Sequence, residues 1–262
     1  MMLFPVSRRY TLVLLALATG VGVAAECPQQ PFAPPVETVM PGCHLPGETR
    51  EAAFCAAGPD GWRLCKCLAS SEDSHRAVFR LQQNGKTVRR WSGEAYYGSV
   101  DDFHAVRADF NGQGGRQLLV ANRVGETMGM GVRSWRLSVW PGIDASGKPA
   151  TLLVQDFGPD ALAQRPGSPA CRVLATRWRS AGNHTEFVGV WAGVQAGRFA
   201  PLSGEPARVR RYRDSFEQER LGDSGEGLYF FRPGKWLENP DTRAVPDGRR
   251  AWREILSLER GD

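Results

Sequence analysis

The sequence predicts an all-β domain built from antiparallel strands, and three observations support this fold class. Short runs of β-branched and aromatic residues recur between residues 62 and 232, and glycine, proline or aspartate separates them. Asn84-Gly85 and Ser146-Gly147 are typical of tight turns between antiparallel strands. Few segments show helical periodicity. We therefore expect hairpins rather than parallel strands joined by crossover helices.

Individual runs place the strands along the chain. The expected strands are residues 62–68, 77–81, 87–91, 106–110, 117–122, 132–140, 150–155, 172–178, 186–192, 207–212 and 227–231. Two helices are expected, at 214–221 and 249–258. In the second helix, Trp252, Ile255, Leu256 and Leu258 can form an apolar stripe.

Residues 1–25 have the pattern of a signal peptide. Arg8 and Arg9 precede an apolar run at 10–18, and small residues at 23–25 suit a signal peptidase. The apolar run is shorter than the roughly 20 residues that a membrane-spanning helix needs. We expect cleavage after Ala25, a periplasmic or secreted protein, and no membrane span after signal cleavage.

The charge pattern argues against a nucleic-acid partner. The formal net charge of the whole chain is +5, and loss of the leader removes two arginines and no acids. Basic and acidic residues are interspersed, whereas a nucleic-acid binder concentrates basic charge on one face. The expected organisation is a signal peptide at 1–25, a Cys/Pro-rich N-terminal segment at 26–60, an all-β domain at 61–236 and a C-terminal tail with a short helix at 237–262.

Six cysteines are candidates for disulfide bonds, because thiols tend to pair outside the cytoplasm. They are Cys27, Cys43, Cys55, Cys65, Cys67 and Cys171. Their connectivity stays open, but Cys65 and Cys67 alternate along an expected strand and therefore need different partners. We expect a loop-rich segment at 27–67, stapled to itself and, through Cys171, to the body of the protein.

One segment carries a family resemblance. Val106-Arg-Ala-Asp-Phe-Asn-Gly-Gln-Gly-Gly-Arg-Gln-Leu-Leu-Val-Ala-Asn122 resembles an FG-GAP or VCBS repeat, an Asp-rich loop between two strands of a β-propeller blade. Residues 134–142 resemble the next strand and exit turn, and 173–202 is a weaker echo. The resemblance implies an antiparallel, irregular or small β-propeller-like domain. The repeats cannot be phased along the whole chain, so a β-sandwich stays open as an alternative.

In that family the loop often binds calcium through oxygens at alternate positions. The matching residues here are Asp109, Asn111, Gln113, Gly115 through its carbonyl, and Gln117. Only one of them is a carboxylate, whereas calcium is a hard cation that favours several. Asp109 and Asn111 can instead close the loop by accepting backbone N–H bonds, as in Asx turns. We expect no cofactor and keep calcium as the alternative.

Other polar clusters are less specific. Asp101, Asp102 and His104 lie at the mouth of an expected strand and could serve acid–base or metal chemistry, or form a polar turn. The chain has neither an HExxH motif nor Gly-x-Ser-x-Gly, so we identify no catalytic residue.

A basic run near the end of the β region is a candidate binding site. Arg208, Arg210, Arg211 and Tyr212 could hold a carboxylate or a sugar acid. The alternative is a solvated edge strand whose charges prevent association of sheets.

Two functions fit these observations. The first is a secreted or periplasmic, non-enzymatic binding or scaffold module whose partner is an extracytoplasmic protein or a glycan. The alternative is an extracytoplasmic hydrolase that acts on a polymer such as a glycan. Its acid and base would be carboxylates from distant strands, and sequence alone does not show such a pair.

Overall fold

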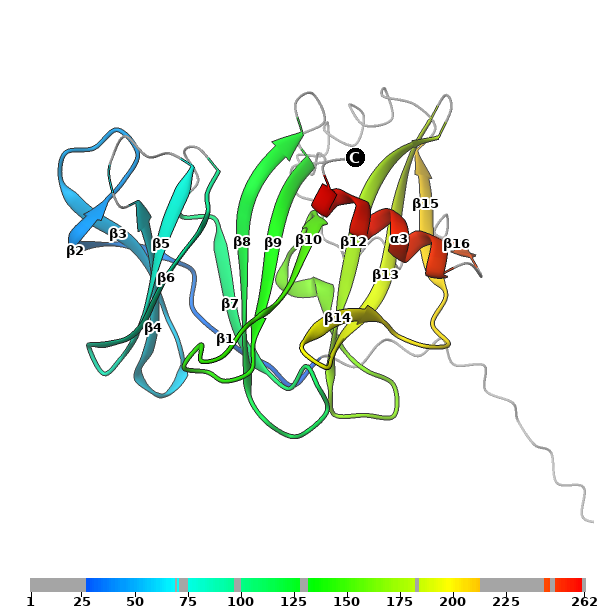
Figure 1. Cartoon of the computed structure of the whole chain (residues 1–262), viewed down its shortest axis with the longest axis horizontal. Coiled ribbons are helices and arrows are strands. Elements are labelled where there is room, and N and C mark those ends of the chain that lie inside the picture. Colours follow the sequence, from blue (N-terminus) through cyan, green and yellow to red (C-terminus); the bar gives the residue numbers. More distant parts are fainter. Residues whose placement is uncertain are drawn as a thin grey trace, which may run out of the picture.

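The computed structural model describes residues 27–68, 70, 75–96, 100–127, 132–181, 184–212, 243–245 and 248–260. In this part of the chain, three antiparallel sheets stand side by side and one α-helix lies across the C-terminal sheet (Figure 1). The all-β prediction is confirmed. The expected signal peptide at 1–25, the expected strand at 227–231 and the expected helix at 214–221 lie outside the described residues.

The N-terminal sheet is a five-stranded meander in which each strand pairs with the next. Its strands are β2 (Val36–His44), β3 (Glu51–Ala57), β4 (Trp62–Leu68), β5 (Arg76–Gln83) and β6 (Lys86–Glu94).

The expectation of a loop-rich segment at 27–67 was wrong, because β2, β3 and β4 occupy much of it. Proline is tolerated in β2 because this strand lies at the edge of the sheet and its register shifts between Val39 and His44. Within the shift, Gly42 has φ +66, and Arg80 donates hydrogen bonds to the carbonyls of Pro41 (2.8 Å) and Gly42 (2.9 Å). The arginine replaces ladder hydrogen bonds that the bulge interrupts.

The central and C-terminal sheets follow along the chain. The central sheet contains, in spatial order, β1 (Gln30–Pro31), β7 (Phe103–Ala108), β8 (Gln117–Thr127), β9 (Val132–Trp140) and β10 (Ala150–Gln155). The C-terminal sheet contains β11 (Leu162–Gln164), β12 (Cys171–Ala181), β13 (His184–Gln195), β15 (Ala207–Tyr212) and β16 (Arg243–Val245), with β14 (Arg198–Pro201) paired to β13.

The central sheet is buried on both faces. In β8, Leu118 and Val120 pack with the N-terminal sheet, and the alternate residues Leu119 and Ala121 pack with the C-terminal sheet. The result is three layers of open sheets stacked face to face. A closed propeller is not shown.

The C-terminal helix α3 (Gly248–Ser257) packs against the hydrophobic core between the central and C-terminal sheets. Ala251, Trp252 and Ile255 are buried against the C-terminal and central sheets. The expected helix at 249–258 is therefore confirmed, but Leu256, which we placed in its apolar stripe, is exposed. No helix among the described residues is long and apolar enough to cross a membrane.

All six cysteines are paired. The bonds are Cys27–Cys171, Cys43–Cys67 and Cys55–Cys65. The different partners expected for the two cysteines of β4 are confirmed, as is the long-range link through Cys171. Three disulfides fit an oxidising, extracytoplasmic environment.

We expect the Cys27–Cys171 bond to stabilise the fold more than the Cys55–Cys65 bond. The bonds span 144 and 10 residues, and chain entropy alone then gives about 5 and about 3 kcal/mol. The measurement is urea unfolding of two double variants, Cys27→Ala with Cys171→Ala and Cys55→Ala with Cys65→Ala. All four positions are buried, so losses from cavities are similar. Equal losses of stability in the two variants would contradict the prediction.

Candidate functional site

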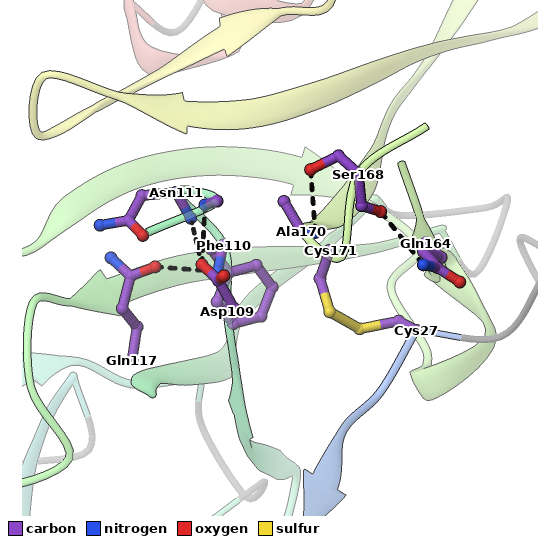
Figure 2. Close-up of a disulfide and its surroundings, with 10 residues drawn as sticks. Cys27, Asp109, Phe110, Asn111, Gln117, Gln164, Ser168, Ala170 and Cys171 are labelled. Carbon is purple, nitrogen blue, oxygen red and sulfur yellow. Dashed lines mark hydrogen bonds between the residues drawn. A yellow bond between two sulfur atoms is a disulfide. The ribbon is translucent and has the colours of Figure 1, made fainter. Parts of the chain in front are cut away.

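The Asp109 loop joins β7 to β8 and closes on its own aspartate (Figure 2). Oδ1 of Asp109 accepts the backbone N–H groups of Asn111 (3.1 Å) and Gly112 (2.7 Å). Oδ2 accepts the N–H of Gly114 at 2.8 Å. This is the Asx-type closure that we expected from the sequence. Gly112 and Gly114 have φ +77 and +74, values that residues with a β-carbon rarely adopt.

The other expected calcium ligands lie on the same loop. Oδ1 of Asn111 accepts the N–H of Gln113 at 3.0 Å, and the buried Gln117 accepts the N–H of Phe110 at 2.8 Å. These side-chain oxygens therefore already bond to the loop itself. Within the described ranges, no group of three or more His, Cys, Asp or Glu residues could hold a metal. Calcium at this loop stays a prediction.

The same loop ties the central sheet to the C-terminal sheet. The carbonyl of Asp109 accepts the N–H of Cys171 at 2.6 Å, and the carbonyl of Phe110 accepts the N–H of Val194 at 3.4 Å. Figure 2 shows the loop beside the Cys27–Cys171 disulfide. Its backbone and the disulfide therefore join the two sheets at the same place.

We predict that the loop depends on Asp109 and little on calcium. Asp109→Ala leaves three N–H groups without their acceptor and should lower the free energy of unfolding by about 1–2 kcal/mol. The free energy of unfolding should differ by less than about 1 kcal/mol between roughly 5 mM calcium and a buffer with chelator. This calcium concentration lies above the dissociation constants of extracellular calcium modules, which reach about 1 mM. Thermal melts of both proteins test this. A large rise of Tm in calcium that disappears in Asp109→Ala would establish a calcium site.

The basic run lies in β15. This strand pairs with β13 along its length and with β16 at residues 207–209, so its first half is not a sheet edge. The side chains of Arg208, Arg210, Arg211 and Tyr212 are outside what the structure describes. Binding by these residues stays a prediction.

The Asp101–His104 segment belongs to a charged cluster at one end of the sheets. Arg123 bonds to the carboxylate of Asp102 at 2.6 Å, pairs with Glu126, and lies 4.6 Å from the ring centroid of Tyr96. The Nζ of Lys66 lies 3.5 Å from the carbonyl oxygen of Asp102. The sequence did not connect Lys66 with this cluster, because the contact joins strands of two different sheets.

Burial changes the titration of this cluster. Lys66 is fully buried between Leu64 and Leu68 on the inner face of β4, and its burial lowers its pKa to about 7, although the charge of Asp102 raises it. Burial also lowers the pKa of His104, whose ring stacks on Trp135 at 5.4 Å. Asp102 is therefore part of an ion-pair network with Arg123, whereas His104 packs on an indole ring.

Lys66 should make stability depend on pH above neutrality. Between its folded pKa of about 7 and its unfolded value near 10.5, the unfolded chain holds a proton that the folded protein lacks. The free energy of unfolding therefore rises with pH across this range. Lys66→Met should remove the rise, measured by urea unfolding at pH 7 and pH 9.5. A variant that retains the full rise would show that another group causes it.

A cleft of about 250 Å³ opens between the N-terminal and central sheets. Aromatic side chains form one wall: Phe79 and Trp91 stack with ring centroids 5.2 Å apart, and Trp140 lies tilted at 5.3 Å from Trp91. The guanidinium of Arg89 lies 5.8 Å from the ring of Trp140. The hydroxyl-bearing residues of the lining are Ser92, Ser138 and Thr151.

Polar contacts fix one side of the cleft. The Nδ2 of Asn122 donates to the carbonyl of Glu94 at 2.7 Å, and Arg136 bonds to the carboxylate of Glu94 at 3.2 Å. Arg136 also pairs with Glu259, whose other oxygen accepts the N–H of Leu153 at 2.7 Å. The last described turn of the chain therefore holds a residue of the cleft in place.

Two buried polar atoms of the cleft residues have no hydrogen-bond partner in the described part of the chain. They are Oδ1 of Asn122 and Nε1 of Trp140, in side chains only 5% and 6% exposed. A buried polar atom without a partner costs about 1–3 kcal/mol, so native proteins rarely keep one without a role. Other residues, such as His44 and Trp135, also have such a buried atom, so the cleft is the strongest candidate site because its two atoms occur together with an aromatic wall.

Sequence reasoning missed this site. Its residues come from five strands of two sheets, and each of them resembles an ordinary core or edge residue of its own strand. Comparisons of the chain with family models, curated proteins and solved structures give no match. The FG-GAP or VCBS resemblance therefore stays a prediction.

Proposed function

We propose that this protein is a periplasmic or secreted binding module that holds its ligand in the cleft between the N-terminal and central sheets. The observation that carries the proposal is the aromatic wall beside the unpartnered atoms of Asn122 and Trp140. Ligand sites typically combine apolar and aromatic walls with a few convergent polar groups. The three disulfides and the expected leader support the location outside the cytoplasm.

The lining favours binding over hydrolysis. Glycosidases typically use two carboxylates about 5–9 Å apart, one of them with a raised pKa. Glu94 is the one carboxylate among the described residues that line the cleft, and it pairs with Arg136. We therefore propose a non-enzymatic module, and the polymer hydrolase stays the alternative.

A printed array of glycans and peptides tests the proposed function. Fluorescently labelled mature protein should bind at least one feature, and Trp91→Ser should weaken that binding at least about tenfold, since aromatic pairs and burial are worth about 1–3 kcal/mol. Val88→Ser is the control, because Val88 lies on the same strand, is 45% exposed and is outside the cleft lining. Binding that both variants retain equally would contradict a site in the cleft.

A further inference from the structure

The cleft is small for a ligand site. Its volume of about 250 Å³ lies just below the about 300–1,000 Å³ typical of small-molecule pockets. It can therefore hold a single ring rather than several consecutive units. A polymer would enter it with one unit.

The two unpartnered atoms define the chemistry of that ring. Oδ1 of Asn122 is an acceptor and Nε1 of Trp140 is a donor. A hydroxyl group can serve both kinds of atom, because it donates one hydrogen and offers two lone pairs. An aromatic or aliphatic ligand satisfies neither atom. Both residues line the cleft and both atoms lie just beneath its surface, so a ligand hydroxyl bonds to them when the two side chains turn toward it.

Charge in the cleft is balanced within the protein. Arg136 pairs with both Glu94 and Glu259, which leaves no net positive charge on that side. Arg89 is exposed to solvent, and its charge lowers the pKa of the nearby Asp144, after the larger effect of hydrogen bonds from Ser146. An anionic ligand would therefore lose hydration without gaining an unpaired positive charge.

Resting on the proposed function, we propose that the cleft binds one neutral pyranose unit of a glycan. The apolar C–H face of the ring lies on the corner formed by Trp91 and Trp140. Its hydroxyls bond to Nε1 of Trp140, Oδ1 of Asn122 and the hydroxyl side chains of the lining. The ring therefore uses both the aromatic wall and the two atoms that have no partner among the described residues.

The test is calorimetric titration of the mature protein with cellobiose, maltose and chitobiose as neutral probes. A digalacturonate serves as the anionic probe and the tripeptide Gly-Trp-Gly as the peptide probe. At least one neutral disaccharide should bind more tightly than the other two probes. Trp140→Phe should weaken its binding about tenfold, which corresponds to roughly one hydrogen bond or 1.4 kcal/mol, in a variant that circular dichroism shows to be folded at the temperature of the titration. Trp91→Ser should abolish binding, and Val88→Ser should leave it unchanged.

The outcomes separate this inference from the proposed function. Tighter binding of digalacturonate overturns the neutral ligand, and tighter binding of the peptide overturns the sugar but keeps a binding module. No binding of any neutral disaccharide at roughly 50 mM, far above the about 1 mM Kd of a weak ligand, also overturns the sugar. Unchanged affinity in Trp140→Phe overturns the hydrogen bond to the indole.

Discussion

The burial of the central sheet on both faces is the constraint on which the other features depend. In the run from Leu118 to Ala121, every side chain is apolar and at most 3% exposed, so both faces of this part of β8 are shielded from water. Each buried side chain of this size contributes about 1.5–3 kcal/mol. Each outer sheet buries its apolar face against one face of the central sheet. Packing of one outer sheet therefore supports the position of the other.

A layered core requires that polar groups between the layers be satisfied, and here they gather near the ends of the strands. Asp156, which follows β10, accepts bonds from Nε1 of Trp178 (2.9 Å) and the N–H of Arg133 (3.2 Å), and its burial raises its pKa to about 6. The contact between the Nζ of Lys66 and the carbonyl of Asp102 links the N-terminal sheet to the central sheet in the same way. These contacts link strands of different sheets, so they fix how the layers are placed relative to one another.

The sequence predicted what lies within single strands and missed what arises between sheets. The bounds of β4, β9, β10 and β15 match the predicted runs of β-branched and aromatic residues between turns. The alternation of Cys65 and Cys67 along β4 correctly predicted that they have different partners. The strands β2 and β3 were missed because Pro41 within β2, and Pro46 and Pro59 in the flanking loops, indicated loops. An edge position and Arg80 make Pro41 compatible with a strand. The cleft depends on which faces meet across two sheets, and no periodicity within one strand carries that information.

The position of the cleft follows from the edges of the sheets. β6 and β10 are edge strands of their sheets, and residues of both line the opening, where large aromatic rings separate the layers. Twisted sheets packed face to face diverge toward their edges, so space remains there once the centre of the interface is filled. The carboxylate of Glu259 accepts the backbone N–H of Leu153 on the edge strand β10 and forms an ion pair with Arg136. Because the end of the chain is bonded both to the sheet edge and to the cleft, the shape of the site depends on the docking of α3.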